Sequence, residues 1–184
     1  ELSSDGRWLA LAGKGVIRKA STAEAPGIVH EEINLTDEMR QDDGQIYLFD
    51  RTKPKGQMTL LRGHRGSVLS ATFAPVQEET KPILVSVGRE WSGSKFTGWI
   101  RIWDVEAGKA IAEKEIEKDP GNGRPQISIQ RTGNGLKDLV VGIAWGDGKF
   151  RVWNVKSGAV GSGDTHLLAD TVVSYRDGHN AIRF

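Results

Sequence analysis

The stretch Trp99-Ile100-Arg101-Ile102-Trp103-Asp104 decides the fold, because the chain contains two further versions of it. The earlier version is Gln45-Ile46-Tyr47-Leu48-Phe49-Asp50, and the later one is Lys149-Phe150-Arg151-Val152-Trp153-Asn154. Each alternates like a strand and ends in Asp or Asn before a turn. The ends lie 54 and 50 residues apart. This recurrence predicts a repeat architecture with one four-stranded sheet per repeat.

Further short segments between these versions also have strand patterns. Residues 67–73 and 126–130 alternate apolar with polar residues, while 83–87 and 139–145 are rich in β-branched residues and are followed by Gly. Residues 109–117 contain strong helix formers, but the repeat requires an outer strand there, and outer edges tolerate charge. We therefore predict strands in all five segments.

Three segments break this rhythm. Residues 14–41 mix apolar and charged residues, and we predict a long surface insertion that carries a small hairpin. Residues 89–98 form a shorter insertion at the equivalent place in the next repeat. Residues 159–170 are Gly-rich and then polar, which predicts a loop.

Composition restricts the class of protein. The 184 residues are 38% hydrophobic and 27% charged, as in soluble globular domains. The net charge of +1 argues against a dedicated nucleic-acid or membrane surface, and no apolar run approaches membrane-spanning length. The chain has no Cys, which excludes disulfides and thiolate metal sites. Together with the lack of a visible signal peptide, this favours a cytoplasmic location.

The repeats resemble the WD-repeat β-propeller family. The resemblance rests on the strand end Ile102-Trp103-Asp104, on Gly63-His64 upstream of it and on Gly178-His179 near the C-terminus. The turns Asp42-Asp43-Gly44 and Asp147-Gly148 precede the other two versions of the strand. The resemblance covers most of the chain except the two insertions. It implies an all-β fold of β-propeller blades, each of four antiparallel strands, with about three blades' worth in this chain.

The resemblance also implies a division of the chain, which we expect to be a single partial β-propeller over residues 1–184. The expected parts are a blade portion over 1–61 that includes the insertion 14–41, a blade over 62–118, a blade over 119–175, and the first strand of a further or shared blade over 176–184. Residues 8–12 are expected to be a second strand and 180–184 a first strand. Propellers need at least four blades to close, so we expect a piece of a larger propeller. A gap in the sequence and closure by copies of the chain are the alternatives.

In this family, a His, an Asp from the turn between the second and third strands, a Ser or Thr, and the Trp hydrogen-bond through each blade. The residues assigned to this structural network are His64, Ser86, Trp103, Asp104, Asp43, Asp147, Trp153 and His179. The turn at 89–98 has no Asp, and Ile143 replaces the Ser in the blade of Asp147. We therefore expect a weaker or water-satisfied network in both blades.

No group of residues has the spacing of a catalytic or metal site. His64 and His179 are candidate bases or metal ligands, but their Gly-His context favours structural pinning. His30-Glu31-Glu32 lacks the spacing of a zinc-binding helix and is better explained as a solvated face. We predict that the chain is not an enzyme and has no cofactor, metal or catalytic residue.

The insertion 89–98 contains the candidate partner-binding residues Arg89, Trp91, Lys95 and Phe96. Their composition is typical of binding hot spots, although packing on the blade edge would also explain the aromatic residues. The resemblance thus implies a non-enzymatic scaffold that binds other proteins or peptides, and not nucleic acid or membranes. Its partner could also be the rest of its own propeller or a second copy. The alternatives are a docking or sensor module of a larger enzyme, such as a protease, kinase or NTPase, and an oligomeric propeller lectin.

Overall fold

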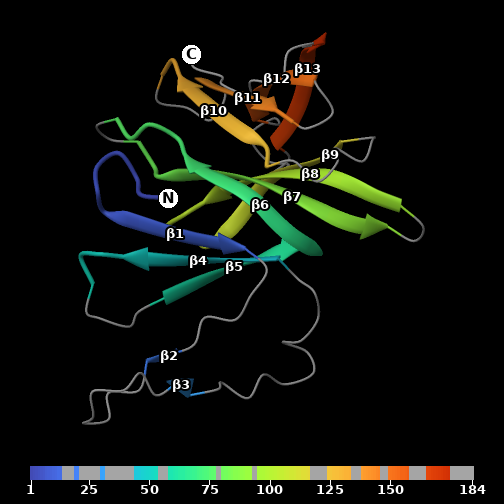
Figure 1. The fold of residues 1–184 in the computed structure, drawn as a ribbon. Helices are drawn as coiled ribbons and strands as arrows, with labels where there is room; N and C mark the ends of the chain where they lie inside the picture. Colours follow the sequence, from blue (N-terminus) through green and yellow to red (C-terminus); the bar gives the residue numbers. More distant parts are fainter. Residues whose placement is uncertain are drawn as a thin grey trace.

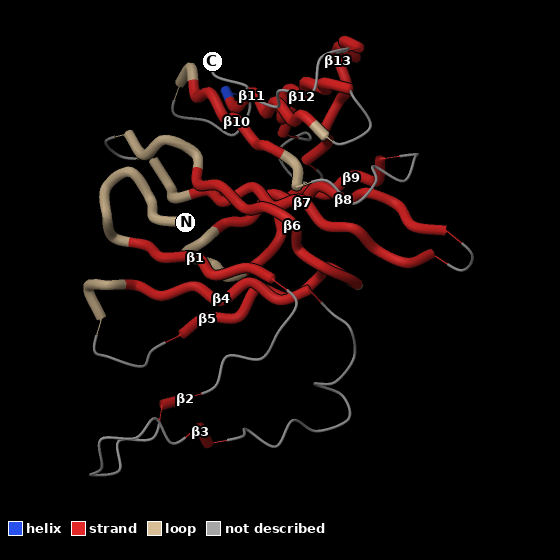
Figure 2. The backbone as a smooth tube through the Cα atoms, in the orientation of Figure 1, coloured by secondary structure: helices blue, strands red, loops and turns tan. Residues whose placement is uncertain are grey.

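The computed structural model describes residues 1–13, 19–20, 30–31, 44–53, 58–77, 80–92, 95–116, 124–133, 138–145, 149–157 and 165–174. All thirteen elements in these ranges are strands, which confirms the all-β prediction (Figure 2). The described strands form stacked sheets and do not close into a barrel.

Three sheets of three or four strands form the main part of the described structure, and we number them along the chain. The first sheet, in the order β1-β4-β5, contains β1 (Trp8–Gly13), β4 (Gly44–Asp50) and β5 (Met58–His64). The second sheet contains β6 (Gly66–Phe73), β7 (Ile83–Ser92), β8 (Lys95–Asp104) and β9 (Lys109–Ile116). The third sheet contains β10 (Gln126–Arg131), β11 (Leu139–Ala144), β12 (Lys149–Ser157) and β13 (Thr165–Ser174).

Within each sheet the paired strands are antiparallel. The second and third sheets are also joined at one point, where Thr165 of β13 lies parallel to Ala112 of β9. This bridge links β6 to β13 into one hydrogen-bonded set of eight strands. The small hairpin predicted within 14–41 is present as β2 (Lys19–Ala20) and β3 (His30–Glu31).

The strand pattern of the sequence is largely confirmed. Residues 109–116 form β9 and not a helix, and residues 8–12 lie in β1. The loop predicted for 159–170 was wrong from Thr165 onward, because β13 begins there, where the Gly-rich stretch has ended. The first strand expected at 180–184 lies outside the described residues.

Each sheet has two faces, and we name them by the repeated strand. The signature face carries Phe49, Trp103 or Trp153, and the reverse face is the opposite one. Figure 1 shows the second sheet between the other two. Its signature face packs on the reverse face of the first sheet, where Trp103 and Leu84 join a buried cluster with Ile46 and Leu48.

The same arrangement occurs one sheet further along the stack. Trp153 and Val141, on the signature face of the third sheet, share a buried cluster with Ile100 and Ile102 on the reverse face of the second. The exposed fractions of Trp103 and Trp153 are 1% and 2%, which confirms that both are core residues. Burying large aromatic side chains of this kind is a dominant contribution to the stability of a core.

Candidate functional site

The predicted insertion 89–98 is not a loop but the continuation of two long strands. Four further residue pairs extend the ladder between β7 and β8: Arg89 with Gly98, Glu90 with Thr97, Trp91 with Phe96, and Ser92 with Lys95. The loop prediction failed because Gly88 was interpreted as the end of a strand, whereas β7 continues through it.

The end of this hairpin projects beyond the rest of the second sheet. β6 pairs with β7 only as far as Glu90, and β9 pairs with β8 only as far as Gly98. Residues 91–92 and 95–96 therefore extend past both neighbouring strands, at the right of Figure 1. A hairpin end of this kind presents backbone edges that neither β6 nor β9 covers.

The candidate partner-binding residues all lie on this hairpin. The Arg89 guanidinium is 3.7 Å from the centre of the Phe96 ring, which is within cation–π range. Phe96 is half-buried and Lys95 is exposed. Trp91 pairs with Phe96, but its side chain lies outside the described part of the structure.

Two cations that the sequence analysis did not assign lie beside His64, and one of them is near the hairpin. Arg62 and Arg65 are exposed, and they flank His64 where β5 leads into β6. Because Gly66 pairs with Glu90, Arg65 lies close to the base of the projecting hairpin. The dipeptide Gly63-His64 was interpreted only for its His, although the basic residues around it were visible in the sequence.

His64 joins the first sheet to the second through a buried hydrogen-bond network. It is the last residue of β5, and its imidazole is fully buried. Its Nε2 lies 2.7 Å from Ser86 Oγ, and Trp103 Nε1 donates to the same oxygen at 2.8 Å. Three of the residues expected from the family resemblance are therefore in one network.

A carboxylate that the sequence analysis missed completes this network. Glu90 Oε1 lies 3.0 Å from His64 Nδ1, and Arg101 Nη1 also donates to Glu90. The expectation of a weaker or water-satisfied network was wrong for this sheet, because Glu90 of the extended β7 supplies an acid where the family uses an Asp from the turn. Arg101 also contacts the exposed Glu113 through Nε at 3.2 Å.

One set of donors and acceptors satisfies the contacts among Trp103, Ser86, His64 and Glu90, while Arg101 Nη1 lies 2.7 Å from His64 Nδ1. A proton on His64 Nδ1 is donated to Glu90, while Nε2 accepts from Ser86 and Ser86 accepts from Trp103. Burial, reinforced by the charge of Arg101, lowers the pKa of His64, so the ring is neutral. Burial alone would raise the pKa of Glu90, but hydrogen bonds from His64 and Arg101 outweigh it and lower that pKa.

Ser86, His64 and Glu90 have the order of a Ser-His-acid triad, which activates a Ser nucleophile in hydrolases. The environment of Ser86 is incompatible with that chemistry. Ser86 has 0% exposure, and its oxygen already accepts the Trp103 indole hydrogen. A substrate carbonyl could reach it only by displacing Trp103, so the geometry supports pinning of the sheets.

Gly88 provides the space for the His64 ring. A Cβ at this position would lie 2.4 Å from His64 Nδ1, closer than van der Waals contact allows. In the third sheet the equivalent position is Trp145, since Trp103 pairs with Leu84 and Trp153 pairs with Val141. The indole of Trp145 reaches to within 3.0 Å of where a Cβ on Gly98 would lie. A bulky apolar contact therefore replaces the polar network there.

The third sheet has no such network among its described residues. Ile143 occupies the place of Ser86, and the buried Trp153 Nε1 has no hydrogen-bond partner in the described part of the chain. The weaker network expected for that repeat stays a prediction, because Asp147 lies outside the described residues. The assigned residues Asp43, Asp147 and His179 lie outside the described residues.

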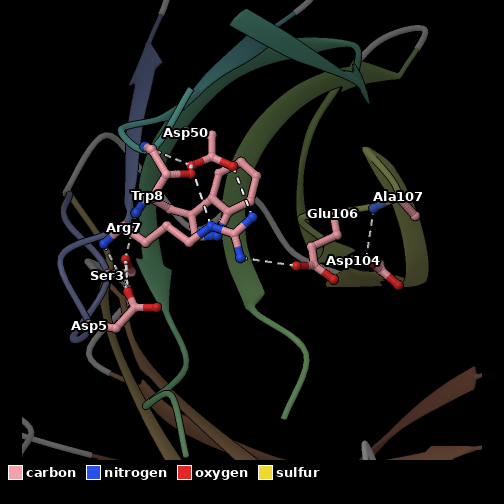
Figure 3. Close-up of polar contacts among 9 residues, drawn as sticks. Ser3, Asp5, Arg7, Trp8, Asp50, Asp104, Glu106 and Ala107 are labelled. Carbon is pink, nitrogen blue, oxygen red and sulfur yellow. Dashed lines mark hydrogen bonds and ion pairs between the residues drawn. The ribbon is translucent and has the colours of Figure 1, made fainter. Parts of the chain in front are cut away.

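The Asp residues that end the repeated strand stabilise the following turn. Asp104 Oδ1 accepts from the amide of Ala107 at 2.9 Å, and Asp50 Oδ1 accepts from the amide of Thr52 at 3.0 Å. Figure 3 shows Arg7 between Asp50 and Glu106, with contacts of 2.9 and 3.3 Å. The hydrogen bond from Arg7 holds the pKa of Asp50 well below its usual range.

Within the described ranges, no group of three or more His, Asp or Glu side chains is arranged to hold a metal ion. No described helix has the length and apolar character needed to cross a membrane. A scan against protein-family models matched no family, and a search of curated proteins found no match.

Proposed function

We propose that the chain is a non-enzymatic interaction scaffold of the WD-repeat type, whose sheets act as β-propeller blades. The propeller assignment is supported by the shared register of the three repeats. Phe49, Trp103 and Trp153 pair with Leu9, Leu84 and Val141 at equivalent positions of the second and third strands of each repeat. Such recurrence of a strand pair is typical of repeat architectures.

The projection of residues 91–92 and 95–96 carries the assignment of the contact surface. Strand edges that extend past their neighbours can pair with an added strand from a partner. The aromatic ring of Phe96 and the nearby Arg65 and Lys95 favour a partner that presents acidic and apolar side chains. We therefore propose an extended, acidic peptide segment of another protein as the partner.

The burial of the network around Ser86 supports the non-enzymatic part of the proposal. The arrangement nearest to a catalytic triad has no route to substrate, because Ser86 is fully buried beneath Trp103. Its charges are instead used to hold two sheets together. A structural use of these groups agrees with a scaffold whose binding residues lie on projecting elements.

The test replaces residues 91–96 by Asn-Gly, which forms a tight hairpin turn. We expect an unchanged melting temperature, because neither β6 nor β9 pairs with the removed residues. The shortened variant should no longer capture the proteins that the wild type captures from lysate, as identified by mass spectrometry. Lys95→Glu should weaken the capture of the same proteins. Lys53→Glu is the matched control, since Lys53 is an exposed cation in the turn after β4. Equal capture by the wild type, the shortened variant, Lys95→Glu and Lys53→Glu would refute the assignment.

A further inference from the structure

The first sheet has an apolar signature face that contrasts with its covered reverse face. Leu9, Leu11, Tyr47, Phe49, Met58 and Leu60 share this face, because Leu9 pairs with Phe49, Leu11 and Leu60 with Tyr47, and Met58 with Phe49. Leu11 and Met58 are both 43% exposed. None of the six belongs to the buried clusters of the described residues. Large exposed apolar patches commonly mark interaction sites.

The two interfaces inside the chain indicate what covers such a face. The signature faces of the second and third sheets are each covered by the reverse face of the preceding sheet. Among the described residues no sheet covers the equivalent face of the first sheet, where Leu11 and Met58 are exposed and the other four residues are half-buried. The missing occupant therefore has the chemistry of a reverse face, with a flat apolar centre.

The third sheet has a reverse face of this kind on the side away from the second sheet, where Phe150 and Val152 are half-buried and Gly142 and Ala144 are buried. Gly142, Ala144, Phe150 and Val152 occupy its centre, at the positions that Ala10, Ala12, Ile46 and Leu48 occupy in the first sheet. Both sets combine two small residues with two large ones, and neither contains a charge. The first of these faces covers Trp103, so the second has the composition needed to cover Phe49.

We propose that a second copy of the chain packs its third sheet on the signature face of the first sheet, head to tail. The contact continues the stacking seen twice within the chain, and it rests on the proposed repeat architecture. Two copies joined in this way at both ends would bring six sheets into one ring, within the range of four to eight blades that propellers use.

The mass in solution tests this contact. Light scattering after size-exclusion chromatography should give about twice the monomer mass of 20.1 kDa at high protein concentration. Leu11→Glu, on the first sheet, and Val152→Glu, on the third, should each give monomers. Mixed together they should form a dimer again, because each variant retains the face that the other has lost. A wild-type chain that stays monomeric at every concentration would overturn the proposal.

Further variants keep the test decisive. If Val152→Glu alone still dimerised, two signature faces would be in contact and the head-to-tail arrangement would be wrong. Met58→Glu and Val140→Glu repeat the experiment on the same two faces, with circular dichroism as the check on folding. The variant with the shortened β7–β8 hairpin should dimerise like the wild type. Loss of partner capture and loss of dimerisation are therefore separable results.

Discussion

At the scale of single residues, the two carboxylates that contact Arg101 differ sharply in environment. Glu90 is 3% exposed and also holds His64, whereas the side chain of Glu113 is 56% exposed. Breaking a buried ion pair typically costs about 3–5 kcal/mol, because the remaining charge has lost its partner. An exposed pair is typically worth about 1 kcal/mol or less.

Glu90→Ala should therefore lower the free energy of unfolding by about 3 kcal/mol or more. Glu113→Ala is the matched control, since it removes the other acid on the same guanidinium and should cost about 1 kcal/mol at most. Urea denaturation monitored by Trp fluorescence measures both. Equal losses in the two variants would contradict the assignment of Glu90 to the buried network.

The neutral His64 predicts a pH dependence of stability. Its pKa is lowered in the folded state, so below about pH 6.5 the unfolded chain takes up a proton that the folded chain does not. The free energy of unfolding should fall as the pH decreases from 7 to 5, by up to about 1.4 kcal/mol per pH unit. His64→Gln should be less stable at pH 7 and should vary less over this range. Parallel pH profiles would show that His64 is not the titrating group.

At the scale of strands, Gly88 shows why local sequence predicted the sheet better than the site. A Gly after a β-branched run predicts the end of a strand, and after residues 139–145 that interpretation worked, since β11 ends at Ala144. In β7 the Gly instead marks close approach by another side chain, the ring of His64. Local sequence does not carry this information, because His64 comes from another sheet.

Glu90 was missed for the same reason. Its carboxylate reaches His64 only because β7 continues past Gly88, and its partner Arg101 lies on the neighbouring strand. Ser86 and Trp103, in contrast, were assigned because the repeat places them at defined positions. The alternating patterns thus predicted most strands, while contacts between strands depended on registers that only the folded chain defines.

Gly88→Ala should destabilise the wild-type protein by about 1–3 kcal/mol, because the added methyl group and the His64 ring cannot share the space. In a His64→Ala background the same substitution should cost much less, since the ring is gone. Chemical denaturation of the four proteins gives the coupling energy between the two positions. Additive effects would show that the ring does not lie over Gly88.

At the scale of the whole molecule, the three sheets form a stack in which each interface is asymmetric. Composition and repeat pattern predicted an all-β repeat protein, and the order of the strands followed from it. The open signature face of the first sheet was not predicted. A continuous apolar run such as Ile46-Tyr47-Leu48-Phe49 indicates a strand with two apolar faces but not which face the rest of the chain covers.

The interface between the first and second sheets is made by main-chain contact at one end of β4 and includes exposed side-chain contacts at the other. A Cβ on Gly44 would lie 2.0 Å from the carbonyl oxygen of Gly66, so the two main chains are in direct contact. At the far end, Arg7 reaches across to Glu106 through side chains that are 39% and 46% exposed. Ser4 also bonds the amide of Val76 near that end.

The two ends of this interface should therefore respond differently to ionic strength. The contact between Gly44 and Gly66 is steric and does not depend on ionic strength. The other end includes the exposed ion pair between Arg7 and Glu106, which salt screens. Raising the salt concentration should therefore speed hydrogen exchange at the Val76 amide and leave exchange at the amide of Val68, which lies beside Gly44, unchanged. Salt would thus weaken the contacts at the Arg7 end of the interface, while the main-chain contact at Gly44 stays unchanged.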